Sequence, residues 1–104
     1  MLVVNGDNYQ EEVVKADKLV MLDFYADWCG PCRMLAPVVE KIADEMEGMV
    51  KVGKVNVDQN QELAGNFDVM SIPTLVFLKE GQMVAKLVGL RDKKEILEEI
   101  EKWK

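Results

Sequence analysis

At the centre of this sequence stands Asp23-Phe24-Tyr25-Ala26-Asp27-Trp28-Cys29-Gly30-Pro31-Cys32, where an apolar strand pattern gives way to a helical one. Cys29 and Cys32 are the only cysteines among the 104 residues, and two thiols at this spacing can close a disulfide within a single turn. A sulfur at a helix start lies among backbone N–H groups that favour negative charge. Because the thiolate is the nucleophile in disulfide exchange, this segment indicates redox chemistry.

The residues on either side of this junction predict a buried strand followed by an amphipathic helix. Residues 19–26 are almost continuously apolar, as in a central strand that is covered on both faces of its sheet. Within 31–47 the apolar residues recur at helical spacing, namely at Leu35, Val38, Val39, Ile42, Ala43 and Met46. Gly48 is placed to end this helix, and Pro37 is expected to kink it because it removes a backbone hydrogen bond.

The rest of the chain continues the alternation of strands and helices. The further predicted elements are a strand at 2–4, a helix begun by a capping box at 7–10, a strand at 50–57 with Gly53 as a candidate bulge, a helix at 59–65, two strands at 74–79 and 82–88 joined by Glu80-Gly81, and a final helix begun by a capping box at 92–95. This order predicts an α/β fold with a central mixed sheet, parallel and antiparallel, of about five strands flanked by four helices.

Length, composition and charge narrow the class of protein. The chain is long enough for one domain, 1–104, but not for two. The net charge of −6 argues against nucleic acid as a partner, because phosphate binding needs a basic face. The apolar runs are too short to span a bilayer. The N-terminus shows no targeting segment, so either the chain stays in the compartment where it is made or such a segment has already been removed. We therefore expect a cytoplasmic monomer with neither nucleic acid nor membrane among its partners.

The absence of histidine excludes several kinds of site. Without histidine the chain cannot build a Ser-His-Asp or Cys-His catalytic arrangement or a His-ligated metal site. Arg33 follows the second cysteine, so the pair is not a haem attachment motif. Two thiolates cannot complete a tetrahedral zinc or iron–sulfur site unless the chain dimerises. No metal is therefore expected.

Four segments, in this order along the chain, resemble the thioredoxin family. Residues 23–32 resemble its active-site segment, and Ala36-Pro37 resembles its kinked helix. Ser71-Ile72-Pro73-Thr74 resembles its cis-proline segment, and Val88-Gly89 resembles the end of its last strand. Tyr25 departs from some members, which carry a second tryptophan there, but it keeps an aromatic side chain. The resemblance covers essentially the whole chain and implies the thioredoxin fold.

The position of the helix start predicts different roles for the two cysteines. Cys29 precedes the helix and is expected to be the exposed nucleophile, whereas Cys32 lies one turn in and is expected to be more covered and to resolve the mixed disulfide. A static structural disulfide is the alternative, although so small a loop constrains the unfolded chain weakly. Gly30 and Pro31 are expected to tune the reduction potential of the cysteine pair. Because proline removes a donor that would stabilise the thiolate, we expect a reductant.

Asp23 interrupts the apolar strand, where an ionised carboxylate is costly. One interpretation is a structural Asp that is hydrogen-bonded to the backbone or paired with a lysine. The other, which the resemblance favours, is a carboxyl with a raised pKa that deprotonates Cys32 through a water. Lys54 is the expected electrostatic partner, because it shares strand parity with Val50 and Val52 and its stem would point inward.

The resemblance also implies a shallow apolar surface that binds targets. It implies a cis bond between Ile72 and Pro73, which places the Ile72 backbone beside the sulfurs so that an extended substrate segment can pair with it. The expected contact residues are Trp28, Gly30, Pro31, Ile72, Pro73, Val88 and Gly89. The simpler alternatives are a trans turn at Pro73 and a core position for Trp28, and a core position is favoured for Trp103. The seven methionines are expected to fill the core, with packing as the simple interpretation of Met34 and Met70.

The leading functional hypothesis is a general protein dithiol–disulfide oxidoreductase, an enzyme with a redox-active cysteine pair and no bound cofactor. The resemblance implies disulfide-containing target proteins and a separate thioredoxin reductase, supplied by NADPH or ferredoxin, as partners. The alternative is a non-enzymatic protein-binding subunit or holdase that uses the same apolar surface without turnover. Activity that survives loss of both cysteines would favour that alternative.

Overall fold

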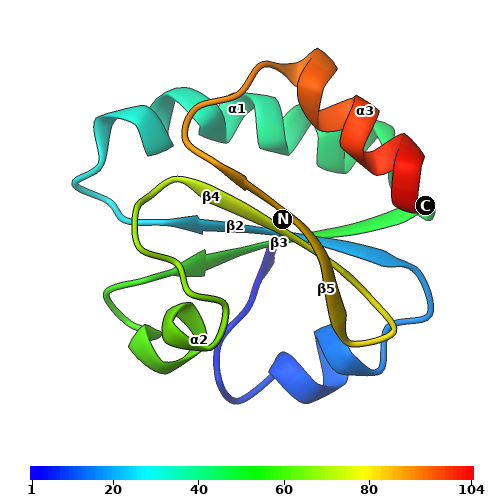
Figure 1. The fold of residues 1–104 in the computed structure, drawn as a ribbon, viewed down its shortest axis with the longest axis horizontal. Coiled ribbons are helices and arrows are strands. Elements are labelled where there is room, and N and C mark those ends of the chain that lie inside the picture. The colour runs from blue at the N-terminus through cyan, green and yellow to red at the C-terminus, as the bar shows by residue number, and fades with distance from the viewer.

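A five-stranded mixed sheet with helices on both faces organises the chain, and the computed structural model describes residues 1–104. Its elements are β1 (Leu2–Val3), the π-helical turn η1 (Gln10–Val14), β2 (Leu19–Tyr25), α1 (Gly30–Glu45), β3 (Val50–Asn56), α2 (Gln61–Asn66), β4 (Thr74–Lys79), β5 (Gln82–Val88) and α3 (Lys93–Trp103). α1 and α3 cover one face of the sheet, while α2 and η1 lie on the other (Figure 1). The predicted fold class is confirmed.

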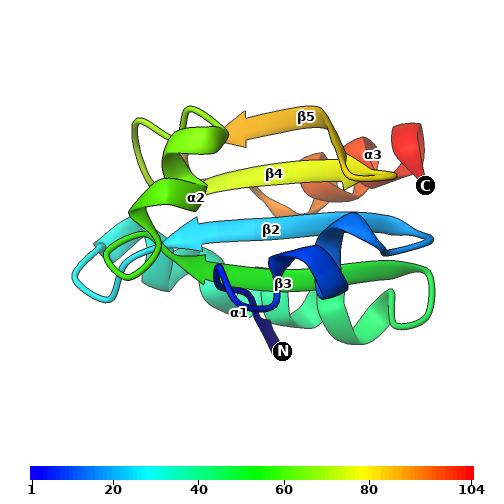
Figure 2. The same ribbon diagram turned by 90° about the horizontal axis from the view of Figure 1, so that it is seen from below.

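The strand order β1-β3-β2-β4-β5 places β2 in the middle of the sheet (Figure 2). β1 and β2 run parallel to β3, whereas β4 runs antiparallel to both β2 and β5. β2 leads directly into α1, and the Cys29–Cys32 disulfide lies at that junction. The redox pair therefore directly follows the central strand of the sheet, which is hydrogen-bonded to a neighbour on each side.

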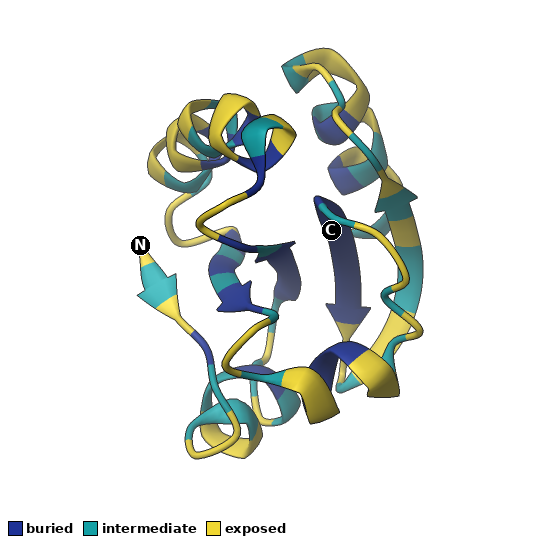
Figure 3. Ribbon diagram, turned by 90° about the vertical axis from the view of Figure 1, so that its left-hand side faces the viewer, coloured by how far each residue is buried: buried dark blue, intermediate teal, exposed yellow.

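Two apolar cores, one on each face of the sheet, follow from the alternation of side chains along the strands. Leu19 and Met21 of β2 pack with α1 and α3, while Val20, Leu22 and Phe24 pack on the side of η1 and α2. The central strands are accordingly buried along almost their whole length (Figure 3). A carboxyl on β2 that points to either face must therefore lie in an apolar environment.

Gly53 does not form the bulge that the sequence suggested. The parallel register of β2 and β3 runs without interruption through the pair Leu22 and Gly53, and a register shift occurs instead at Phe77/Leu78 of β4. Glycine is required for space: a Cβ on Gly53 would lie 2.9 Å from Cγ2 of Val4 and 3.3 Å from Cδ2 of Leu22. The close approach of Val4, which follows β1, explains why position 53 is glycine.

Gly53→Ala is therefore expected to lower the free energy of unfolding by about 1–3 kcal/mol, because overpacking a tight core forces its neighbours to move. Gly65→Ala is the matched control, since a Cβ on Gly65 of α2 would meet no atom within 4 Å. That variant is expected to be more stable by up to about 1 kcal/mol. Urea unfolding measures both, and equal effects of the two substitutions would contradict this account of Gly53.

The sequence signals at the helix ends had different outcomes. The capping box predicted at 7–10 is wrong: η1 begins at Gln10 without a side-chain cap, and Asn5 Oδ1 instead accepts hydrogen bonds from the N–H groups of Asp7 and Asn8. The capping box of α3 is confirmed, with Asp92 accepting from the Glu95 N–H at 2.8 Å.

The predicted limits of α1 and the predicted hairpin are close to what the structure contains. α1 ends at Glu45, two residues before the predicted Glu47, and it runs through Pro37 without a break. Glu80 and Gly81 both have positive φ, of 53° and 78°, as the predicted tight turn between β4 and β5 requires.

The expectation that the methionines fill the core is wrong. Only Met21 is fully buried and Met46 is half-buried, whereas Met1, Met34, Met49, Met70 and Met83 are exposed. Leucine, valine, isoleucine and phenylalanine fill the two cores instead. Trp103 is half-buried against the core on the α1 side, in agreement with its predicted place.

Candidate active site

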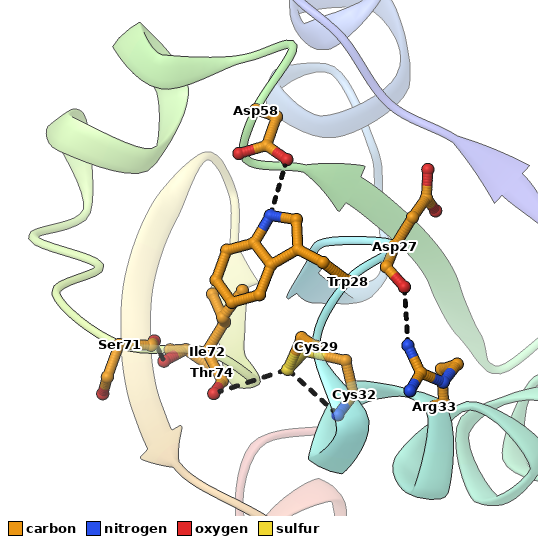
Figure 4. Close-up of a disulfide and its surroundings, with 9 residues drawn as sticks. All are labelled: Asp27, Trp28, Cys29, Cys32, Arg33, Asp58, Ser71, Ile72 and Thr74. Carbon is orange, nitrogen blue, oxygen red and sulfur yellow. Dashed lines mark hydrogen bonds between the residues drawn. A yellow bond between two sulfur atoms is a disulfide. The ribbon is translucent and has the colours of Figure 1, made fainter.

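The disulfide lies where the sequence predicts it, at the first turn of α1 (Figure 4). Cys29 is the N-cap residue, and its Sγ accepts a hydrogen bond from the Cys32 N–H at 3.2 Å. Pro31 occupies the first turn and offers no N–H of its own. A helix-start amide therefore points at the Cys29 sulfur, which favours negative charge on that atom once the disulfide is opened.

The expectation that Cys29 is the more exposed cysteine is not met in the disulfide form. The exposed fraction is 4% for Cys29 and 3% for Cys32. Val57 and Ile72, which come from segments distant in the sequence, pack against the pair and cover both residues.

The two cysteines instead differ in the cavity that each one lines. Cys29 lines an open cavity of about 530 Å³ with mostly apolar walls. That cavity is formed by Trp28, Cys29, Gly30, Pro31, Val57, Val69, Met70, Ser71 and Ile72. Cys32 lines a smaller cavity of about 210 Å³, which is also lined by Asp23, Tyr25 and Lys54. Cys29 is therefore next to an apolar surface, and Cys32 shares a cavity with the titratable carboxyl of Asp23.

Ile72 and Trp28 both line the open cavity, and both side chains are drawn with Cys29 in Figure 4. The Ile72–Pro73 peptide bond is cis, as the resemblance implied, and the Ile72 carbonyl oxygen lies 3.9 Å from Cys29 Sγ. Trp28 is 68% exposed, so its alternative interpretation as a core residue is wrong. Its indole N–H donates to the Asp58 carboxylate at 2.9 Å, which fixes the orientation of the ring beside the sulfur.

The other expected contact residues adjoin this cavity without lining it. Pro73 is buried, and its carbonyl oxygen accepts a hydrogen bond from the Gly89 N–H at 2.8 Å. Gly89 has a φ of +91°, which favours glycine, and the neighbouring Val88 is exposed. The backbone after β5 is thus tied to the cis-proline segment, and Val88 adds apolar surface next to it.

Sequence reasoning missed part of this surface. The additional residues are Val57, Asp58, Val69, Met70 and Ser71. Met70 directly precedes the cis-proline segment and Ser71 is its first residue, so their position along the chain was a usable signal. Val57 and Asp58 follow the end of β3, and only the sheet order brings them beside Trp28.

Asp23 is buried on β2 and lies on the face that carries α1. Its Oδ1 has no hydrogen-bond partner in the protein. Burial raises the pKa of Asp23 from 3.8 to about 7, and the nearby Lys54 ammonium lowers it in part. A carboxyl with this pKa exchanges a proton near neutral pH, as a general acid or base must.

Lys54 is the register partner of Asp23 in the neighbouring strand β3. Both side chains line the smaller cavity, as the strand parity predicted, because Gly53 leaves the register unbroken. The Lys54 ammonium also lies 5.6 Å from the centre of the Tyr25 ring, where a cation is attracted to the aromatic face. Tyr25 therefore helps to hold the lysine over the cavity.

No group of three or more His, Cys, Asp or Glu side chains in the structure is arranged to hold a metal ion. None of the helices combines the length and the apolar character needed to cross a bilayer. The site has a disulfide at the start of the helix that follows the central strand, with an apolar cavity and a buried carboxyl beside it. This combination defines the class of dithiol–disulfide oxidoreductases.

Comparison with known proteins gives the family. A family model described as Thioredoxin matches residues 1–102. The chain is 45% identical over 94 residues to the thioredoxin of Chlorobaculum thiosulfatiphilum, covering 90% of this chain and 87% of that protein. It is 46% identical over 96 residues to the thioredoxin of Haemophilus influenzae, covering 92% and 90%. The solved structure of a mutant thioredoxin from Halobacterium salinarum NRC-1 superposes with a TM-score of 0.88 at 42% identity, over 98% of this chain and 88% of that chain.

The chain therefore belongs to the thioredoxin family. It is a dithiol–disulfide oxidoreductase whose redox-active pair is Cys29 and Cys32. Members of this family use their own cysteine pair without a cofactor, act on disulfide-containing targets and typically work with a reductase.

Proposed function

We propose that this chain is a general reductant of protein disulfides in which Cys29 attacks and Cys32 resolves. The Cys29 thiolate forms a bond to one target sulfur, and the other target sulfur leaves as a thiolate. Cys32 then attacks Cys29 Sγ, which restores the internal disulfide and releases the second target thiolate. The target gains two electrons and the cysteine pair loses two. The observation that carries this assignment is that Cys29 lines the open apolar cavity and Cys32 the cavity of Asp23.

Asp23 is proposed to accept the proton that Cys32 must lose before it attacks. Its raised pKa of about 7 matches this task near neutral pH. The shared cavity of about 210 Å³ has room for a water that relays the proton. Lys54, which faces the same cavity, is proposed to stabilise the carboxylate form of Asp23.

Target recognition is proposed to use the backbone of Ile72 and the apolar residues around it. The Ile72 carbonyl oxygen beside Cys29 Sγ supports strand-like pairing with an extended segment of the target. The remaining contact residues in this proposal are Trp28, Gly30, Pro31, Pro73, Val88 and Gly89. A surface with few charged side chains and two glycines accommodates many target sequences, which supports broad specificity.

The electron source is proposed to be a separate thioredoxin reductase that uses NADPH or ferredoxin. We further propose that residues 1–104 act as one domain, as a monomer and in the cytoplasm. The test is reduction of insulin disulfides by this protein with each reductase system in turn. Insulin reduction that requires the chain and one of the two donors supports the proposal. A chain that binds unfolded protein but leaves insulin oxidised with both donors overturns it and favours the holdase.

Pro31→His is expected to raise the reduction potential by an amount on the order of tens of millivolts. Histidine restores a backbone N–H in the first turn of α1 and adds an imidazole that can carry positive charge, and both stabilise the Cys29 thiolate. Equilibration with glutathione buffers measures the potential. Pro37→His, in the same helix but away from the sulfurs, is the matched control. An unchanged potential in Pro31→His would contradict the proposed role of the proline.

A further inference from the structure

Met70 combines exposure with a position at the active site. Its exposed fraction of 92% is the highest among the large apolar side chains of the chain. It lines the same open cavity as Cys29 and Ile72, and it lies two residues before Ile72, whose peptide bond to Pro73 is cis. A thioether at this place is accessible to small oxidants and belongs to the cavity that the proposed function assigns to target binding.

We propose that Met70 is a peroxide-oxidation site that controls target binding, an inference that rests on the proposed function of the apolar cavity. The oxidant is hydrogen peroxide. The thioether sulfur of Met70 gains one oxygen atom to become a sulfoxide and loses two electrons, the O–O bond breaks, and the second oxygen leaves as water. The product is reversible by methionine sulfoxide reductases.

In the disulfide form of the protein, peroxide is expected to oxidise methionine and not cysteine. Cys29 and Cys32 are bonded to each other and no free cysteine exists, so no thiolate competes for peroxide. Met34 and Met49 are also exposed, at 65% and 50%, but neither lines the cavity. Oxidation of those residues therefore leaves the proposed target surface unchanged.

The sulfoxide is expected to weaken target binding because it places a polar oxygen in an apolar wall. Cys29, Val69 and Ile72 around Met70 offer mainly apolar surface. A target that covers the sulfoxide must desolvate it without a compensating hydrogen bond. Met70 also loses the flexible, polarisable thioether that adapts to irregular partners. We expect the effect mainly with protein targets, because a small disulfide covers less of the surface around Cys29 than a protein does.

The experiment uses the full chain in its disulfide form, treated with hydrogen peroxide and then freed of it with catalase. Peptide mass spectrometry gives the sulfoxide fraction at each methionine. After reduction, the rates with insulin and with a small aromatic disulfide are measured and normalised to the untreated sample of the same variant. The variants are wild type, Met70→Leu and, as matched control, Met34→Leu.

We expect Met70 to oxidise first and the KM for insulin to rise by roughly three- to tenfold in wild type and Met34→Leu, with little change for the small disulfide. Met70→Leu is expected to keep its own untreated KM after peroxide. Sensitivity of Met70→Leu equal to that of wild type, slower oxidation of Met70 than of Met34, or unchanged insulin kinetics once Met70 is converted would each overturn the inference. If the untreated wild type does not reduce insulin, that result would instead overturn the proposed function.

Discussion

Cys32→Ser is expected to hold a target protein as a stable mixed disulfide on Cys29. In this variant the attack by Cys29 still takes place, because its sulfur retains the open cavity and the N–H of residue 32. No second thiol remains to attack Cys29 Sγ, so the intermediate persists until an external thiol is added. Non-reducing electrophoresis and intact mass measure the complex with insulin, and steady-state reduction is expected to fall to the background rate.

Cys29→Ser is the matched control for this trapping experiment. It keeps one thiol in the same turn of α1, but that thiol lines the cavity of Asp23 and is separated from the target surface. We expect neither a covalent complex nor insulin reduction. Equal trapping by the two single variants would contradict the division of roles, because it would mean that either sulfur can attack a target.

Asp23→Asn is expected to stabilise the protein in a strongly pH-dependent way. Burial raises the pKa of Asp23 from 3.8 to about 7, so the folded state keeps a proton that the unfolded state loses between these pH values. The stability of the wild type therefore falls as pH rises through this window, and it stays low above it. Asn removes the titration, and the gain above pH 7 is about 4 kcal/mol.

The measurement is denaturant unfolding of both proteins at a series of pH values. The difference in free energy of unfolding is expected to vanish near pH 3, to grow between about pH 4 and 7, and then to level. Asp17→Asn, which removes an exposed carboxylate, controls for the loss of one negative charge. A difference that does not depend on pH would show that folding leaves the pKa of Asp23 at its ordinary value, which contradicts the raised pKa.

The same Asp23→Asn variant also tests the proposed proton transfer. Loss of the base is expected to slow release of the target from the mixed disulfide, while the attack by Cys29 keeps its rate. Rapid mixing followed by acid quench separates the two steps. Equal slowing of both steps would remove Asp23 from the resolving reaction and leave it with a structural effect only.

Features that depend on neighbours along the chain were predictable from the sequence. The tight turn at Glu80-Gly81 and the capping box of Asp92 are confirmed because their residue types act within a few positions. The position of Cys29 at the start of α1 follows from the change of hydrophobic period at the same point. Strand parity predicted that the stem of Lys54 points inward, because side chains alternate along an unbroken strand, and Lys54 lines the same cavity as Asp23.

Features that depend on distant segments were not predictable in the same way. The burial of Cys29 comes from Val57 and Ile72, which the sheet brings against the disulfide from two other parts of the chain. Met21 in the core and Met70 on the surface are the same residue type, and only packing distinguishes them. Gly53 was misassigned as a bulge because glycine serves both irregular backbone and close strand contacts, and the closeness of Val4 is a tertiary fact.

The rate of alkylation of each thiol in the fully reduced protein is the most direct test of the central assignment. Iodoacetamide labelling as a function of pH, with peptide mass spectrometry to assign the site, measures it. We expect Cys29 to react first and, near pH 7, faster than a simple peptide thiol, because the helix-start amide stabilises its thiolate. Labelling of Cys32 first, or a rate for Cys29 no higher than that of the peptide thiol, would contradict the account.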